Sequence, residues 1–144
     1  MGSAYNALGE WEKAEVAFSH ALKINPTFQL AINNLAWSEK QKSIDDSLNI
    51  IANNAHTPEE YLNVSLIYYN HGFYLKTIDA CKKAIALNPN FALAYNNMCS
   101  AYNMLKMWDD AIDAGRKAVA LAPGNQLAKN NLAVAEKAKA LNAQ

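Results

Sequence analysis

The stretch SAYNALGEWEKA at residues 3–14 returns, with few changes, as SAYNMLKMWDDA at residues 100–111. The similarity continues at the same offset of 97 residues, where FQLAINNLAWSEKQK at 28–42 matches NQLAKNNLAVAEKAK at 125–139. Between residues 3–42 and 100–139, 20 of 40 positions are identical. Chance does not produce that level of similarity. The chain is therefore built from repeated units, and such units stack on their neighbours.

A shorter period lies inside this long one. A shift of 34 residues superposes a set of like residues, mostly aromatic: Tyr61 on Tyr95, Tyr68 on Tyr102, Tyr74 on Trp108, Ala84 on Ala118 and Pro89 on Pro123. These residues resemble the tetratricopeptide repeat (TPR), a 34-residue unit of two antiparallel helices named A and B. The resemblance implies an all-α solenoid in which antiparallel helix pairs form a right-handed superhelix.

The resemblance divides residues 1–144 into a single TPR array. Its parts are a truncated repeat at 1–28, a shortened and degenerate repeat at 29–57, full repeats at 58–91 and 92–124, and a C-terminal capping helix at 125–144. The stretch 29–57 lacks the Gly-aromatic turn and the closing Asn-Pro. We expect a turn near 41–43 there, with a distorted second helix. This division predicts nine helical segments and no strand.

Local signals mark where several of these helices begin and end. Thr57, Pro58 and Glu60 form the pattern of a capping box with proline at the first helical position. Gly9 and Gly72 are placed for the turn between the A and B helices. Asn-Pro or Ala-Pro pairs end the B helices, because the residue before a proline is pushed away from helical geometry.

The charge balance excludes some classes of partner. The chain carries 13 basic and 13 acidic side chains, whereas nucleic-acid-binding and membrane-surface proteins normally carry a basic excess. We therefore expect no nucleic-acid binding and no direct membrane binding. No apolar run approaches the roughly 20 residues that span a bilayer, and the N-terminus lacks the pattern of a signal peptide. The cytoplasm is favoured for this chain on its own.

No feature of the sequence indicates an enzyme. His20, His56 and His71 fall in different repeats, and no His or Cys spacing is typical of a metal site. Cys81 and Cys99 fall at packing positions, so we expect two buried thiols rather than a redox or nucleophilic pair. We expect no catalytic residue, no metal and no cofactor.

Asparagine pairs recur in LAINNLA at 30–36, LAYNNMC at 93–99 and LAKNNLA at 127–133, although Asn is a mediocre helix former. The TPR resemblance implies that the A helices line a concave groove, with an asparagine at the sixth position of each one: Asn34, Asn63, Asn97 and Asn131. A side-chain amide offers two N–H donors and an acceptor oxygen, so it can pair with a peptide backbone. This ladder predicts a groove that holds an extended peptide without reading its side chains.

The expected groove adds neighbours on the same helix faces, among them three apolar contacts on one helix. The full set is Asn33, Asn34, Trp37, Leu62, Asn63, Leu66, Tyr69, Asn96, Asn97, Ser100, Asn130 and Asn131. The alternative is that each asparagine braces a neighbouring helix or faces water. If Asn131 is a groove residue, Asn131→Ala should leave stability unchanged or slightly raised, because Ala is the better helix former.

We do not expect the chain to bind the acidic C-termini of heat-shock chaperones, as some TPR arrays do. TPR arrays that clamp the acidic C-termini of heat-shock chaperones carry Lys and Arg at set groove positions. Here the fifth position of the A helices holds Asn33, Leu62, Asn96 and Asn130, and no Arg is placed in the groove. The expected partner is therefore a protein or peptide segment that is largely uncharged.

Two functions remain open. The first is a protein-protein interaction scaffold. The alternative is the C-terminal TPR array of a larger enzyme, serving substrate docking or oligomerisation, because residues 66–112 resemble arrays appended to bacterial membrane glycosyltransferases. The opening of the chain in mid-repeat favours such a fragment, and another compartment applies if the enzyme is a membrane protein. The shortened first A helix leaves the apolar side of 11–24 uncovered, so we also expect a homo-oligomer formed through the N-terminal end.

Overall fold

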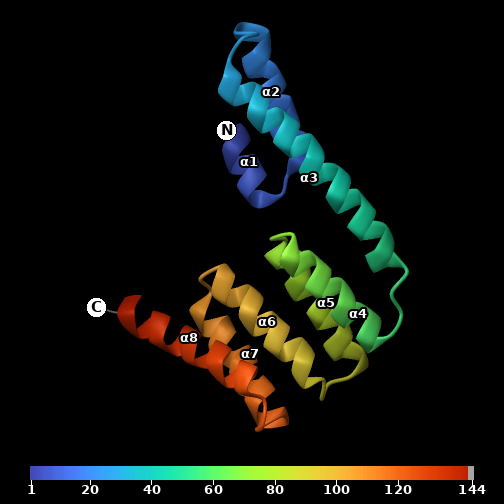
Figure 1. Ribbon diagram of the computed structural model, residues 1–144, viewed down its shortest axis with the longest axis vertical. Coiled ribbons are helices and arrows are strands. Elements are labelled where there is room, and N and C mark those ends of the chain that lie inside the picture. Colours follow the sequence, from blue (N-terminus) through green and yellow to red (C-terminus); the bar gives the residue numbers. More distant parts are fainter. Residues whose placement is uncertain (143–144) are drawn as a thin grey trace. The chain divides into compact units, whose positions relative to one another are not determined.

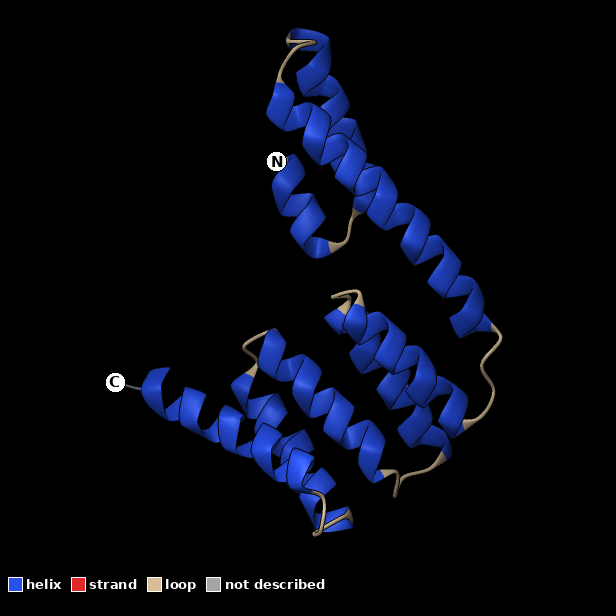
Figure 2. Cartoon of the chain, viewed as in Figure 1, coloured by secondary structure: helices blue, strands red, loops and turns tan. Residues whose placement is uncertain are grey.

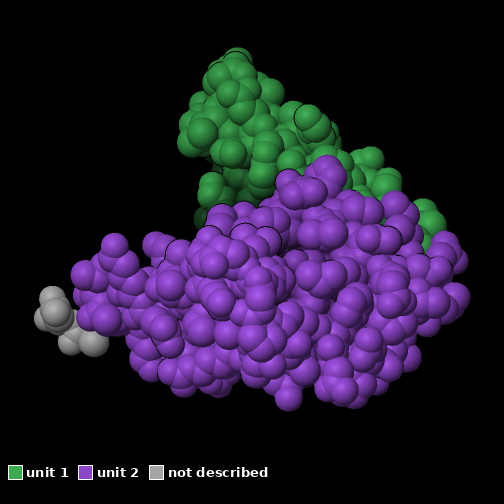
Figure 3. Space-filling view, turned by 60° about the horizontal axis from the view of Figure 1, so that its bottom comes forward, with its two compact units in different colours: residues 1–50 green, residues 51–144 purple. Residues whose placement is uncertain are grey.

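The computed structural model describes residues 1–142, and these residues form helices and no strand (Figure 2). The eight helices are α1 (Gly2–Leu8), α2 (Trp11–Ile24), α3 (Gln29–Asn53), α4 (Pro58–Asn70), α5 (Tyr74–Leu87), α6 (Ala92–Met104), α7 (Trp108–Leu121) and α8 (Gln126–Asn142) (Figure 1). The chain divides into two compact units, residues 1–50 and residues 51–144 (Figure 3).

The expected turn near 41–43 is wrong. The helix α3 runs without interruption from Gln29 to Asn53, so the described residues form eight helices rather than nine. The physical reason is that no Gly or Pro occurs between Pro26 and Pro58, and nothing in the stretch breaks the backbone ladder. The side chain of Lys42 also pairs with Asp46 one turn later, with 3.6 Å between the charged atoms.

The expected caps are present at the other turns. The hydroxyl of Thr57 accepts from the Glu60 N–H at 3.2 Å, and the Glu60 carboxylate accepts from the Thr57 N–H at 3.0 Å. Gly9 and Gly72 have φ values of +72° and +79° at the ends of their helices, and Lys106 takes the same role with φ +59°. Left-handed backbone suits glycine, so Lys106 is a strained member of this set.

The long internal repeat reappears in the helix boundaries. Shifting α2 by 97 residues reproduces the bounds of α7, and the same shift moves the start of α3 onto the start of α8. The turn residue Gly9 falls on Lys106. The two units therefore contain a matched set of helices, which permits a residue-by-residue comparison between them.

In unit 2 the helices form two layers. The A-type helices α4, α6 and α8 contact one another in that order, and α5 and α7 pack against them from one side. The core holds Ile78, Tyr102 and Ile112 in one cluster, and small residues fill the closest approaches. Ala84 and Ala118 are buried, as expected for helix contacts that leave no room for a larger side chain.

In unit 1 the core is smaller. Ala14, Phe18 and Ala31 form its centre, with Tyr5 and Leu35 packed against them. Trp11 is also buried, and its indole N–H donates to the carboxylate of Asp45 at 3.2 Å. These contacts tie α1, α2 and α3 into one compact body.

Candidate functional site

The site residues expected from the sequence fall in both units. Unit 2 holds nine of them, on three neighbouring helices: Leu62, Asn63, Leu66 and Tyr69 on α4, Asn96, Asn97 and Ser100 on α6, and Asn130 and Asn131 on α8. Unit 1 holds Asn33, Asn34 and Trp37 on α3.

Two of the asparagines at the sixth position link neighbouring A helices. The side-chain nitrogen of Asn131 donates to Asn96 Oδ1 at 2.9 Å and to Ser100 Oγ at 2.8 Å, joining α8 to α6. The side-chain nitrogen of Asn97 donates to Ser65 Oγ at 3.2 Å, joining α6 to α4. These side-chain amides link the A-type helices α4, α6 and α8. Each amide keeps its carbonyl oxygen for another hydrogen-bond partner.

The remaining asparagines differ in their surroundings. Asn33 and Asn130 are exposed and accept from the glutamine four residues earlier, at 2.8 and 2.9 Å. Asn63 is exposed on α4 and makes no side-chain hydrogen bond to the described residues. Asn96 is buried beneath Asn131. The asparagine pairs thus combine structural hydrogen bonds with exposed amide groups.

The three apolar residues expected to contact a ligand on α4 differ in their exposure and packing. Leu66 is 45% exposed. Leu62 packs on the cluster around Cys81 and Ala84, so it is a core residue in part. Tyr69 lies edge-on to Tyr74 with 5.3 Å between ring centroids, and burial raises the pKa of its hydroxyl. Only Leu66 offers an open apolar side chain here.

Other exposed aliphatic side chains extend this surface across the A layer. Leu93 on α6 is 47% exposed, and Leu127 and Val134 on α8 are exposed as well. Residues three, four or seven apart lie on one side of a helix, so Leu93 shares a face with the half-buried Asn97. For the same reason Leu127 and Val134 share a face with the exposed Asn130. We name the surface of Asn63, Leu66, Leu93, Asn97, Leu127 and Val134 the A-helix face.

Unit 1 carries a small open pocket between α1 and α3. It has a volume of about 360 Å³ and is lined by Ser3, Asn6, Ala7, Asn34 and Trp37. Trp37 is 46% exposed. Sequence reasoning identified the two α3 residues and missed the three from α1, because the first repeat was treated as having lost most of its A helix. The identity of Asn6 with Asn103 in the long repeat was the signal that could have found them.

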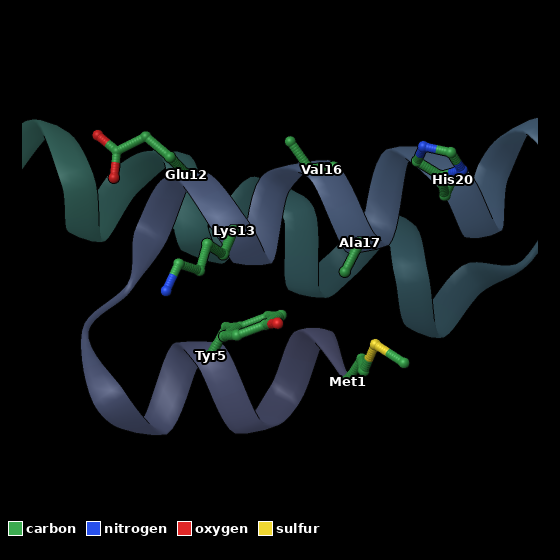
Figure 4. A pocket seen from close by; sticks show the side chains of 7 residues that line it. All are labelled: Met1, Tyr5, Glu12, Lys13, Val16, Ala17 and His20. Atoms are coloured by element: carbon green, nitrogen blue, oxygen red, sulfur yellow. The ribbon is translucent and has the colours of Figure 1, made fainter.

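A second cavity of unit 1 lies between α1 and α2, with a volume of about 510 Å³ (Figure 4). Its walls include Met1, Tyr5, Val16 and Ala17. The Nζ atom of Lys13 stands 5.6 Å from the centroid of the Tyr5 ring. The surface is mainly apolar, so it has the character of a packing surface rather than a site for a polar ligand.

Within residues 1–142, no group of three or more His, Cys, Asp or Glu side chains is placed to hold a metal ion. Cys81 and Cys99 are free and buried. Burial raises the pKa of each thiol to about 11, so neither forms a thiolate readily at neutral pH. No helix in the described part is long and apolar enough to cross a membrane.

No protein-family model and no curated protein matches the chain, but solved structures do. The MamA protein is similar with a TM-score of 0.60 and 23% identity, covering 98% of this chain and 80% of that one. YrrB, a TPR protein with an unusual peptide-binding site, has a TM-score of 0.58 and 15% identity, covering 96% and 74%. The first TPR of Spaghetti (RPAP3), bound to the HSP90 peptide SRMEEVD, has a TM-score of 0.56 and 19% identity, covering 96% and 87%.

The chain has the TPR fold. At these identities the likeness establishes the fold alone, and it agrees with the all-α helix pairs described above. The TPR pattern of the sequence is therefore confirmed at the level of architecture.

Proposed function

We propose that this TPR chain is a protein-interaction scaffold that binds an extended, largely uncharged peptide along the A-helix face. The observation that carries the proposal is the composition of that face. Three adjacent helices expose aliphatic side chains beside amide groups that have hydrogen-bonding capacity to spare. Two of the TPR proteins with similar folds also have peptide sites, one of them occupied by a chaperone peptide.

The amide groups favour recognition of a peptide backbone. Asn63 is free to offer both its donors and its acceptor, while Asn97 donates one N–H to Ser65 and keeps the other. Asn131 uses its nitrogen for Asn96 and Ser100, so it offers mainly an acceptor oxygen. Each neutral hydrogen bond contributes a net ~0.5–1.5 kcal/mol. Two such hydrogen bonds, together with the aliphatic contacts, are enough for modest affinity.

The distribution of charge favours an uncharged ligand. The single arginine, Arg116, lies on α7 and stands 3.4 Å from Glu136, away from the A-helix face. An acidic C-terminal peptide would need basic groups among the A-helix positions that contact it. None of the six residues that define the A-helix face is charged, and the exposed side chains of Glu59 and Lys137, which continue the same helix faces, carry opposite charges. We therefore expect the affinity to change little with salt concentration.

The test is peptide selection followed by titration of matched variants. Immobilised protein is used to select binders from a library of random short peptides, and a selected peptide is titrated by calorimetry. Leu66→Lys combined with Leu93→Lys should weaken binding by at least about tenfold, because two apolar contacts are lost. Leu75→Lys combined with Leu87→Lys is the control, since these α5 leucines are 57% and 53% exposed.

The control variant should bind as the wild type does. Equal losses in both variants, or no loss in the first, would show that the peptide does not use the A-helix face. Thermal melts of both variants check that the fold is retained. The alternative role, docking a substrate for a larger enzyme such as a glycosyltransferase, uses the same face. The length of the natural gene product separates the two roles.

We also propose that the chain self-associates through its N-terminal end. The support is a comparison within the long repeat. Ala101, Tyr102 and Ala114 are buried with Ile78 of α5 in unit 2, whereas Ala4 is exposed and Tyr5 and Ala17 are half-buried beside the cavity of Figure 4. Light scattering should show a dimer that Val16→Asp returns to monomer. A monomer at all concentrations would contradict the proposal.

A further inference from the structure

The long repeat allows one group of side chains to be compared in two versions. In unit 2 the group consists of Ser100, Asn103, Met104, Asn131 and Val134. In unit 1 the residues at the same positions are Ser3, Asn6, Ala7, Asn34 and Trp37, and they line the pocket between α1 and α3. The two versions thus share a serine and two asparagines and differ at two positions.

In unit 2 the shared polar side chains hydrogen-bond to one another. Asn131 donates to Ser100 at 2.8 Å and to Asn96 at 2.9 Å. Asn103 donates its side-chain N–H to the backbone oxygen of Asn131 at 2.9 Å. The amide nitrogens and the serine hydroxyl of this version are therefore engaged within the protein, where they join α6 to α8, while Asn103 Oδ1 is buried without a partner among the described residues.

In unit 1 two polar members of the group, Ser3 and Asn34, are open, whereas Asn6 Oδ1 lies 2.7 Å from Ser38 Oγ. Asn34 and Ser3 make no side-chain hydrogen bond to the residues that the structure describes, and both line the pocket of about 360 Å³. Ala7 replaces Met104, which removes a long side chain from the wall, and Trp37 replaces Val134. The pocket thus combines an aromatic wall with an amide and a hydroxyl that are available to a ligand.

The aromatic wall is held in position by contacts on its far side. Trp37 meets Trp11 in an edge-to-face arrangement, with 5.8 Å between ring centroids and 70° between ring planes. Trp11 is itself fixed by its hydrogen bond to the buried carboxylate of Asp45. A preorganised wall loses less conformational freedom when a ligand packs on it. Trp37 therefore presents a surface suited to binding rather than a loosely held side chain.

We propose that this pocket receives one uncharged, apolar side chain of a bound peptide, leucine or phenylalanine in size, while Asn34 and Ser3 pair with the adjoining peptide backbone. The inference rests on the proposed function and adds a side-chain preference to it. None of the five lining residues is charged, so a charged side chain would lose hydration without gaining an ionic partner.

The experiment uses the full chain and capped tripeptides of the form acetyl-Ala-X-Ala-amide. The readouts are the NMR shifts of the Trp37 indole N–H and of the Asn34 side-chain amide. Peptides with leucine or phenylalanine at X should shift both signals in a saturable manner. Peptides with aspartate or lysine at X should leave them unchanged at the same concentrations.

Two substitutions convert the pocket to the closed version. Ala7→Met and Trp37→Val introduce the residues found at the matching positions of unit 2, and each should weaken binding of the leucine peptide by at least about tenfold. Ala36→Met is the control, because Ala36 is exposed on α3 and does not line the pocket. It should bind the leucine peptide as the wild type does.

The proposal is overturned if the leucine peptide shifts neither signal, or if Ala7→Met binds it as well as the wild type. It is also overturned if the aspartate and lysine peptides bind equally well. These results are distinguishable from failure of the proposed function. In the first case selected peptides still bind unit 2 and still depend on Leu66 and Leu93, whereas failure of the function abolishes both kinds of binding.

Discussion

Asn131 donates its side-chain N–H to the buried oxygen of Asn96 across 2.9 Å, joining the last helix to its neighbour. The second N–H of Asn131 reaches Ser100. The amide is therefore a bracing group, and its removal leaves the Asn96 oxygen unpaired in a buried place. The expectation that Asn131→Ala is neutral for stability no longer holds, because lost hydrogen bonds outweigh the better helix propensity of alanine.

We predict that Asn131→Ala lowers the free energy of unfolding by about 1–3 kcal/mol. Asn63→Ala is the matched control, since Asn63 is exposed and has no such bonds. It should change stability by less than about 0.5 kcal/mol. Urea unfolding followed by circular dichroism measures both. Equal stability of the two variants would show that the contact to Asn96 contributes nothing.

Lys106 occupies a turn position that favours glycine. Its φ of +59° lies in the left-handed region, as do the φ values of Gly9 and Gly72 at the equivalent turns. We predict that Lys106→Gly stabilises the protein by roughly 0.5–1 kcal/mol, whereas Gly72→Ala destabilises it by a similar amount. Gly124→Ala is the control, because its φ is not positive and no atom lies within 4 Å of an added Cβ. A lower melting temperature for Lys106→Gly would contradict this account.

A comparison of the two copies of the long repeat also indicates which substitution would give a buried hydrogen-bond acceptor a donor. The Oδ1 atom of Asn103 is buried and lacks a hydrogen-bond partner among the described residues. At the matching place in unit 1, Ser38 Oγ lies 2.7 Å from Asn6 Oδ1. Its counterpart in unit 2 is Ala135, which is buried. Ala135→Ser should therefore supply the missing donor and stabilise the protein by about 0.5–1.5 kcal/mol.

The reverse change tests the same relationship. Ser38→Ala should cost about 1–3 kcal/mol, because it removes the hydroxyl whose one proton serves Asn6 Oδ1 and the backbone oxygen of Asn34, each 2.7 Å away. Thermal melts should show a higher melting temperature for Ala135→Ser and a lower one for Ser38→Ala, although the two positions match in the long repeat. Destabilisation by both would show that packing around Ala135 leaves no room for a hydroxyl.

The capping box of α4 should make the stability of the folded protein depend on pH. Hydrogen bonds from the backbone N–H groups of His56 and Thr57 lower the pKa of the Glu60 carboxyl from its ordinary value of 4.5. The carboxylate is thus preferred in the folded state. Its contribution is complete above the unfolded pKa and is lost as pH falls through the lowered folded pKa.

The measurement is the melting temperature of wild type and Glu60→Gln at about pH 7 and at about pH 3. Glutamine keeps an acceptor oxygen at the same place and lacks the charge. The wild type should melt higher at neutral pH, and the two proteins should converge in acid. A constant difference across this range would show that the charge of Glu60 has no part in the cap.

The sequence predicted the helix ends best where strong local signals occur. Proline, glycine and the capping box marked the turns on either side of α4 and α5 and the turn after α7, because each restricts the backbone directly. The turn expected at 41–43 had no Gly or Pro and rested on repeat length and on the weak helix-start pattern SIDD at 43–46. There α3 continues, and the helix is held by Asp45 beneath Trp11, a contact between residues far apart in the sequence.

The candidate site was predictable in part. The repeat pattern placed the asparagines on A helices, but it could not show the direction in which each amide points. That direction depends on which neighbour offers an oxygen, such as Asn96 for Asn131 or Ser65 for Asn97. The unit 1 pocket depends on Ala7, whose counterpart in unit 2 is Met104. The sequence shows this difference, but only the structure shows that the smaller side chain leaves a pocket.

An NMR titration of the full chain with a peptide selected on it tests directly whether the A-helix face holds the peptide. The backbone and side-chain amides that shift should belong to α4, α6 and α8, with Asn63 and Asn97 among them. Amides on the outer sides of α5 and α7 should stay unchanged, and the shifts should persist at high salt. Shifts confined to α5 and α7, or binding that disappears as salt is raised, would contradict the claim that the A-helix face holds an uncharged peptide.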